Sequence, residues 1–155
     1  MVSVDEFSHE VHMRRAIELA EQAVEHGNRP FGTVLVHNNE IIMEEENRVI
    51  TENDIRRHPE LHLAMRACNE LDESVRAETV MYTSTEPCPM CAGGIRYAGL
   101  NRIYYSVGSD EITEFTGSSP ITVRSAAILS GITDVIGPVL NEEGRAVHDS
   151  FYGSD

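Results

Sequence analysis

The sequence predicts an α/β fold, a three-layer α/β/α sandwich around a mixed five-stranded sheet. Segments with helical periodicity alternate with short segments rich in β-branched and aromatic residues, which is typical of this class. The first two strands are joined by Asn38-Asn39, a turn signal that predicts an antiparallel hairpin. The later strands are separated by helices, which allows parallel pairing and makes the sheet mixed.

The first third of the chain predicts a helix followed by the hairpin. The helix runs from about Ser8 to His26 and ends at Gly27-Asn28. Its apolar residues recur at helical spacing: Met13, Ile17, Ala20 and Val24. The hairpin strands are residues 31–36 and 40–43.

A second helix is predicted to begin at Pro59, because proline suits the first turn of a helix. Its predicted apolar face consists of Leu61, Ala64, Met65, Cys68 and Leu71. Cys68 is therefore expected to be a small buried residue rather than a metal ligand.

Three further strands and two further helices complete the predicted fold. The strands are residues 79–83, 102–106 and 133–136, and the helices are residues 90–97 and 120–129. No repeat or linker interrupts them, so we expect residues 1–155 to form a single domain.

Composition excludes several classes of protein. No apolar run approaches the roughly 18 residues of a membrane span, and no secretory signal opens the sequence, so a cytoplasmic location is the default expectation. The net charge is -14, and all 12 basic residues are arginine. Such a surface repels a phosphate backbone, and it is tolerated best in a high-salt, halophilic cytoplasm, where charges are screened.

Two motifs carry the chemistry. His58-Pro59-Glu60 is followed by Pro87-Cys88-Pro89-Met90-Cys91. His58, Cys88 and Cys91 can supply three ligands to one Zn²⁺ and leave its fourth position open for water, whose pKa falls toward about 7. Glu60, which is not a ligand, can then move protons as the catalytic group. We expect one zinc ion per chain.

Three alternatives give these cysteines other roles. A thioredoxin-like redox pair is possible for C-x-x-C, but it leaves His58 and Glu60 unexplained. His62, one helical turn after His58, could complete a closed Cys₂His₂ centre. A non-enzymatic, zinc-stabilised binding domain is the corresponding functional alternative.

These residues resemble the cytidine-deaminase-like superfamily, in its branch of guanine and cytosine deaminases and tRNA adenosine deaminases. The resemblance runs from the first helix to about Ser106 and includes the segments 30–36, 47–49, 58–60 and 85–95. It implies the cytidine deaminase-like fold and a hydrolytic, zinc-dependent aminohydrolase that releases ammonia from a cyclic amidine.

The resemblance also implies individual roles. His58, Cys88 and Cys91 match the zinc ligands, and Glu60 matches the proton shuttle, although Pro59 replaces the alanine usual in the family. Asn47 matches an asparagine that binds the base, and Phe31 an aromatic that lines the base pocket. Glu60 and the backbone N–H of Cys88 would flank the reacting centre. A turn residue is the alternative for Asn47, and core packing for Phe31.

The substrate is less well indicated. Pro30-Phe31-Gly32 and Glu86-Pro87-Cys88-Pro89-Met90-Cys91 resemble guanine deaminases, so guanine leads, with cytosine or isocytosine next. Guanine deaminases grip the purine with an acidic residue, which aligns near Ser118 or Ser119 here. The nearby acidic residues, Asp110, Glu111 and Glu114, do not match that position.

A small-molecule nucleobase or nucleoside substrate and a homodimer follow from the same resemblance. From the net charge and the lack of a long apolar run we expect neither a nucleic acid nor a membrane as a partner. A tRNA adenosine deaminase is the alternative, for which Arg56-Arg57 could contribute a basic surface, although Glu44-Glu45-Glu46 opposes it. The segment 149–152 is expected either to close over a pocket or to form a free tail.

Overall fold

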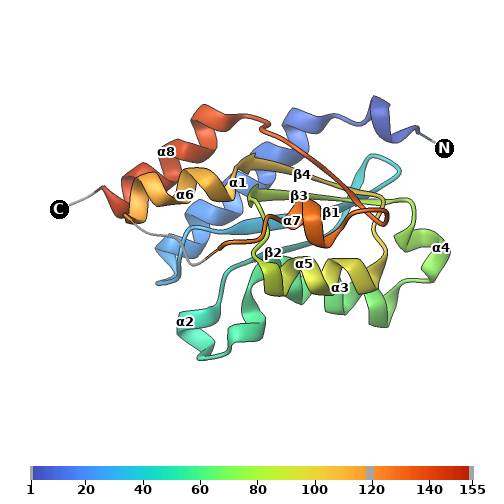
Figure 1. Cartoon of the computed structure of the whole chain (residues 1–155), viewed down its shortest axis with the longest axis horizontal. Helices are drawn as coiled ribbons and strands as arrows, with labels where there is room; N and C mark the ends of the chain where they lie inside the picture. The colour runs from blue at the N-terminus through green and yellow to red at the C-terminus, as the bar shows by residue number, and fades with distance from the viewer. Residues whose placement is uncertain (1, 118–120, 154–155) are drawn as a thin grey trace.

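The computed structural model describes residues 2–117 and 121–153. A mixed five-stranded sheet with strand order β2-β1-β3-β4-β5 lies between two layers of helices (Figure 1). The strands are β1 (Gly32–His37), β2 (Glu40–Glu46), β3 (Thr79–Thr85), β4 (Arg102–Val107) and β5 (Asp134–Ile136). This architecture confirms the predicted fold class.

Strand directions agree with the hairpin and with the helical connections. β1 pairs antiparallel with both β2 and β3, whereas β3, β4 and β5 are parallel. As a result, the start of β1 and the carboxyl ends of β2, β3 and β4 all lie at the same end of the strands, on one side of the sheet.

The helices divide between the two faces of the sheet (Figure 1). One layer contains α1 (His9–Glu25), α6 (Ser109–Thr116) and α8 (Asn141–Tyr152). The other contains α3 (Pro59–Glu70), α5 (Pro89–Ala98) and α7 (Ser125–Ile128). The short helices α2 (Val49–Glu52) and α4 (Glu73–Arg76) and the 3₁₀ turns Val4–Glu6 and Ile55–Arg57 lie in the connections.

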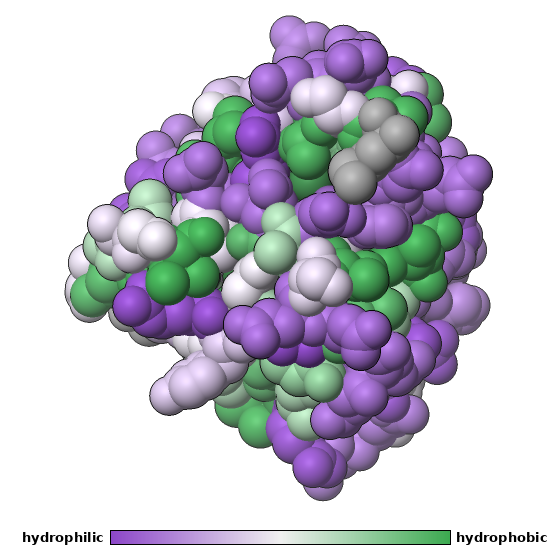
Figure 2. Space-filling view, turned by 90° about the vertical axis from the view of Figure 1, so that its right-hand side faces the viewer, coloured by the Kyte–Doolittle hydropathy of each residue, from purple (hydrophilic) through white to green (hydrophobic). Residues whose placement is uncertain are grey.

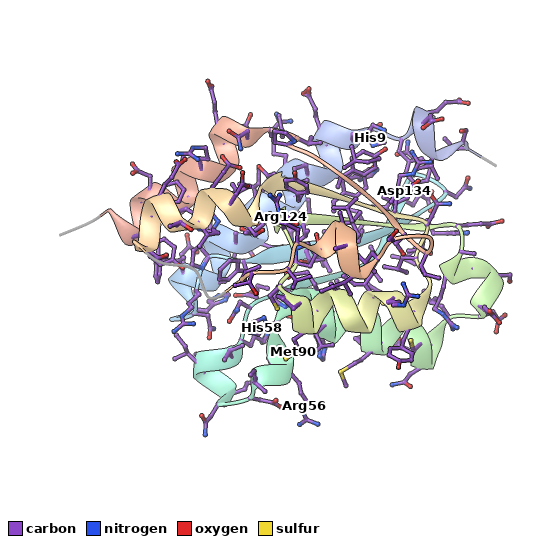
Figure 3. The ribbon with its side chains drawn as sticks, in the orientation of Figure 1. His9, Arg56, His58, Met90, Arg124 and Asp134 are labelled. Carbon is purple, nitrogen blue, oxygen red and sulfur yellow. The ribbon has the colours of Figure 1, made fainter. Side chains whose placement is uncertain are left out.

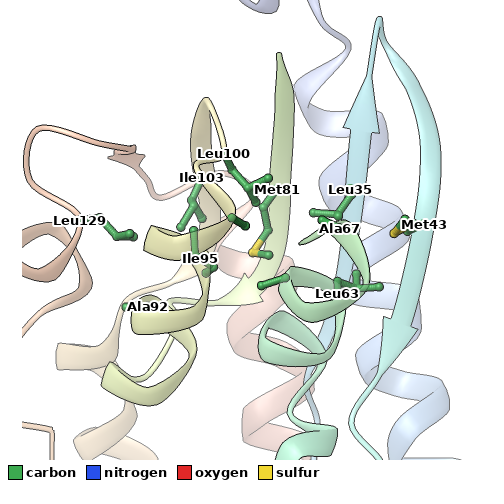
Figure 4. Packing of buried hydrophobic residues seen from close by; sticks show 12 residues of the cluster. Leu35, Met43, Leu63, Ala67, Met81, Ala92, Ile95, Leu100, Ile103 and Leu129 are labelled. Atoms are coloured by element: carbon green, nitrogen blue, oxygen red, sulfur yellow. The ribbon is translucent and has the colours of Figure 1, made fainter. Parts of the chain in front are cut away.

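Alternation along the strands fills two cores. Val34 and Val36 pack beneath α1, while Leu35, between them, packs beneath α3 and α5. Figure 4 shows the second of these cores, in which Leu63 of α3 and Ile95 of α5 meet the sheet. β2 lies at an edge of the sheet, where Glu40 and Glu44 are exposed, whereas Glu46 at the end of the strand is buried.

The sequence misplaced the buried face of α3. Leu63, Ala64 and Ala67 are buried, whereas Met65 and Cys68 are exposed, so the prediction of a buried Cys68 is wrong. The reason is that α3 packs against both the sheet and α5. The helix face that meets these two partners is rotated about the helix axis relative to the predicted apolar face.

The predicted helix 120–129 is also corrected. Residue 120 lies outside the described residues, and α7 begins only at Ser125, because the backbone at Arg124 is extended. α2, α4, α6 and α8 were not predicted.

The surface has the character that the composition indicates. Hydrophilic side chains dominate the face shown in Figure 2, and hydrophobic side chains form separate patches between them. Within the part of the chain that the structure describes, no helix is both long and apolar enough to cross a membrane.

A glycine is required where β1 crosses α1. A Cβ built on Gly32 would lie 2.3 Å from the carbonyl oxygen of Ala16, which is backbone and cannot swing aside. We predict that Gly32→Ala destabilises the protein by about 1–3 kcal/mol or more, measured by urea denaturation at fixed zinc concentration.

Gly93→Ala is the matched control for that substitution. Gly93 lies within α5, and a Cβ at this position would have no neighbouring atom within 4 Å, so alanine there should stabilise the helix by about 0.5–1 kcal/mol. Equal effects of the two substitutions would show that the α1–β1 contact is not tight.

Candidate metal and proton-transfer site

The site forms where α3 and α5 begin, next to the carboxyl ends of β2 and β3. His58 precedes the first turn of α3, and Cys88 precedes the first turn of α5; each is followed by a proline at the first helical position. Because proline fixes φ and needs no backbone partner there, both helices start at defined residues. In Figure 3, His58 and Met90 lie at the same end of α3 and α5.

The three predicted ligands come together. Nδ1 of His58 lies 3.7 Å from Sγ of Cys88 and 3.6 Å from Sγ of Cys91, and the two sulfur atoms are 3.5 Å apart. Ligands about 2.0–2.3 Å from a shared tetrahedral ion would be separated by roughly 3.5–3.8 Å. The geometry and the donor set therefore fit zinc.

The environment favours the ligating form of Cys88. Hydrogen bonding with Cys91, followed by hydrogen bonding with His58, lowers the pKa of the Cys88 thiol to about 4. A thiolate is the form of cysteine that binds metal.

Glu60 lies beside this group but outside it. Its side chain is buried, and its Oε1 accepts a hydrogen bond from Oγ1 of Thr33 at 3.1 Å. Oγ1 of Thr33 is in turn 3.0 Å from Oγ1 of Thr83. Burial, and next the negative charge of Cys88, raise the pKa of Glu60 to about 7. A fixed carboxyl group with such a pKa can both take up and release a proton near neutral pH.

A cavity of about 240 Å³ opens onto these residues. All four predicted substrate contacts line it: Phe31, Asn47, Glu60 and Cys88. A wider depression of about 560 Å³ between α1 and α8 contains none of the predicted site residues.

Asn47 is both a turn residue and a residue of the cavity wall. Its side-chain oxygen accepts a hydrogen bond from the backbone N–H of Val49 at 3.0 Å, which makes a turn. It also lines the cavity, and its backbone N–H donates to the carbonyl oxygen of Phe31 at 2.9 Å. Its role in binding a base stays a prediction.

His62 does not complete a closed centre. Its Nε2 lies 3.5 Å from a carboxylate oxygen of Glu45. Among the described residues, the one group of potential ligands close enough to share an ion is His58, Cys88 and Cys91. The geometry therefore favours three protein ligands over four.

The acidic residues near the aligned position serve other contacts. Glu111 binds Arg145 and Asn141, Glu114 binds Arg145, and Asp110 lies near Arg124. The cavity lining includes none of these three carboxylates. Ser118 and Ser119 lie outside the described residues.

Sequence reasoning missed Glu86 as an anchor of the site. Its buried carboxylate accepts hydrogen bonds from Arg124 at 2.6 Å, from Oγ of Ser125 at 2.6 Å and from the backbone N–H of Ser109 at 3.0 Å. These contacts tie the starts of α6 and α7 to the segment that carries Cys88. Glu86 directly precedes the motif that contains Cys88 and Cys91, but nothing in the sequence indicated which residues it contacts.

α8 brings Tyr152 to the cavity wall, as one of the two alternatives for the segment 149–152 predicted, although the helix itself and the role of His148 were not predicted. Nε2 of His148 lies 2.7 Å from Oγ1 of Thr85, and its ring packs against Phe31 and Tyr152 at centroid distances of 5.6 and 5.9 Å. Tyr152 lines the cavity of its own chain, so the C-terminal segment is not a free tail as far as this residue.

Removing a ligand should release the metal. We predict that His58→Ala or Cys91→Ser reduces bound zinc to well below one ion per chain, measured by atomic absorption after dialysis. His62→Ala and Cys68→Ser are matched controls that should keep about one ion. Zinc loss in His62→Ala would instead establish the closed centre.

Burial of His148 should make stability depend on pH. Burial lowers the pKa of His148 to about 4 from its ordinary value of 6.5. Below about pH 6.5 the unfolded chain binds a proton that the folded chain does not, so stability should fall as pH drops toward about 4, by at most roughly 3 kcal/mol. His148→Phe should flatten this dependence in urea titrations at several pH values. An unchanged slope would contradict the assignment.

Comparison with known proteins agrees with this geometry. A family model described as MafB19-like deaminase matches residues 7–134. A probable cytosine deaminase of Schizosaccharomyces pombe is 31% identical over 151 residues, covering 91% of this chain and 90% of the relative.

Two relatives from Bacillus subtilis have other named substrates. Its guanine deaminase is 37% identical over 108 residues, covering 69% of each chain. Its tRNA-specific adenosine deaminase is 35% identical over 143 residues, covering 92% of this chain and 88% of the relative.

The fold has a solved counterpart. The structure of a guanine deaminase from Nitrosomonas europaea superposes with a TM-score of 0.81 at 20% identity, covering 96% of this chain and 86% of that one. The predicted resemblance is confirmed: the chain belongs to the MafB19-like deaminase family and has the cytidine deaminase-like fold.

Proposed function

We propose that this chain is a zinc-dependent aminohydrolase that releases ammonia from an aminated nucleobase or nucleoside, with guanine as the leading candidate. One observation carries the proposal: the buried carboxylate of Glu60 lies next to the cluster of three candidate ligands, and Glu60, His58 and Cys88 line the same cavity. That arrangement supplies a metal site with a proton carrier next to it, in a place where a small ring can enter.

His58, Cys88 and Cys91 would hold the metal. Zinc bound there lowers the pKa of water and so supplies the nucleophile for attack on the amine-bearing carbon. The remaining steps fall to protein groups that the structure places around the cavity.

Glu60 would move the protons. Its position is fixed by the hydrogen bond from Thr33, so its carboxylate points to one place in the cavity rather than sampling several. It would take one proton from the attacking water and deliver it to the ring nitrogen, and would then take the second proton from the added hydroxyl group and deliver it to the leaving amine. The products are the oxo base and ammonia, so the reaction needs no other co-reactant.

Asn47 and Phe31 would hold the ring. The amide of Asn47 is anchored by its turn, and the ring of Phe31 is held against His148, so both lie on supported parts of the cavity wall. An aromatic wall suits a flat heterocycle, and a fixed amide suits its polar edge.

A tRNA adenosine deaminase remains the alternative, because a relative of that name covers most of the chain. The local charges oppose it. Arg56 pairs with Asp54, and Arg57 pairs with Glu45 and Glu52, so neither arginine offers a free charge to a phosphate. Figure 3 shows Arg56 directed away from the body of the protein.

The homodimer, the cytoplasmic location and the halophilic origin stay predictions. The organisation of residues 1–155 as one domain is likewise our proposal.

Removing the proton carrier should abolish turnover while keeping the metal. We predict that Glu60→Gln lowers kcat for ammonia release by about 10²–10⁴-fold, because general acid–base help is lost, while zinc content and fold are unchanged. Glu70→Gln, at an exposed glutamate of the same helix, is the matched control and should keep full activity.

The substrate should be identified in the same assay. Guanine, cytosine, isocytosine, adenine, their nucleosides and a tRNA stem-loop are compared by ammonia release at high salt. Retained activity in Glu60→Gln would overturn the role of Glu60, and release from the stem-loop alone would establish the tRNA alternative.

A further inference from the structure

The side chain of Arg29 differs from that of every other arginine in this chain. The other arginines each donate to a carboxylate or to a backbone carbonyl, as Arg76 and Arg96 do. The guanidinium of Arg29 makes no hydrogen bond or ion pair with any residue that the structure describes. In a chain with net charge -14, where carboxylates are abundant, an arginine with neither a carboxylate nor a carbonyl partner among the described residues is unusual.

Arg29 lies at the candidate active site. It lines the same cavity as Glu60 and Cys88, and it is within electrostatic reach of His58 and Tyr152. Its carbonyl oxygen accepts a hydrogen bond from the backbone N–H of Phe31 at 2.9 Å, which fixes the backbone beside the cavity. Its side chain is exposed, so its guanidinium belongs to the outer part of the cavity, while Glu60 is buried in the inner part.

This placement constrains which edge of a substrate Arg29 can meet. The amine-bearing carbon has to face Glu60, so the opposite edge of the ring faces outward. A guanidinium has only donors, in a planar fork, and is satisfied by two acceptors side by side.

The candidate bases differ on that outward edge. Guanine carries its amine on C2, and the opposite edge presents O6 and N7, both acceptors, which arginine binds with two hydrogen bonds. Cytosine carries its amine on C4, and the opposite atom, N1, is a donor or bears the sugar. Adenine carries its amine on C6, and the opposite edge pairs the acceptor N3 with N9, which is a donor or bears the sugar.

We propose that Arg29 is a specificity-determining residue that donates to O6 and N7 of guanine. The inference rests on the proposed deaminase function and deepens it, since it selects guanine from the bases that the relatives leave open. Arg29 would then bind the purine in place of the acidic residue that the resemblance led us to expect.

The test removes one acceptor from the base and one donor group from the protein. We compare guanine with 7-deazaguanine, which lacks the N7 acceptor, in the wild type and in Arg29→Ala. Arg29→Ala should lower kcat/KM for guanine by roughly tenfold to hundredfold and should affect 7-deazaguanine much less. The intrinsic difference in reactivity between the two bases cancels in this comparison.

Two further variants isolate the geometry. Arg29→Lys keeps the charge but loses the planar fork, so it should not restore guanine turnover. Arg66→Ala removes the same charge from the exposed side of α3 and should leave both bases unaffected.

The outcomes separate the two proposals. Equal losses for guanine and 7-deazaguanine in Arg29→Ala would overturn the role of Arg29. Calorimetric binding of the two bases to the zinc-loaded Glu60→Gln protein, with and without Arg29→Ala, repeats the comparison without turnover. Binding of guanine that depends on Arg29 and N7, together with a wild-type enzyme that releases no ammonia from any of the substrates tested, would support Arg29 and overturn the proposed function.

Discussion

The packing of α3 against α5 is the contact on which the site depends. It places the first turns of the two helices side by side. Nδ1 of His58 and Sγ of Cys88 therefore lie 3.7 Å apart, although the two residues are 30 positions apart in the chain. Gly94 of α5 lies close to α3 at this contact, since a Cβ there would lie 2.7 Å from a terminal methyl carbon of Leu61. A wider helix separation would leave three ligands unable to share one ion.

The rest of the molecule holds the cavity around that point. Thr33, at the start of β1, orients Glu60 from the sheet side, and Glu86 ties α6 and α7 to the loop before Cys88. α8 contributes Tyr152 to the cavity wall, and its His148 contacts two other residues of that wall, Thr85 and Phe31. These supports come from β1, the loop before Cys88, α6, α7 and α8. The first two meet because β1 begins at the end of the sheet where β3 ends.

The sequence was most informative where function depends on local spacing. The ligands, Glu60 and the starts of both helices could be predicted, because proline positions and the spacing of cysteines act within a few residues. Prediction was weaker for packing. The buried face of α3 was displaced, and Cys68 was exposed, since a helix that touches two partners does not bury a simple stripe.

The sequence by itself predicted the fold class, the candidate metal ligands and the candidate proton carrier. Only the tertiary structure decided that His62 faces Glu45, that Glu86 gathers Arg124 and Ser125, and that the guanidinium of Arg29 stands unpaired at the cavity among the described residues. The physical reason is the distance along the chain between the residues that interact. Periodicity and capping are settled between neighbours in the chain, whereas a side chain's partner across the fold depends on how whole elements pack.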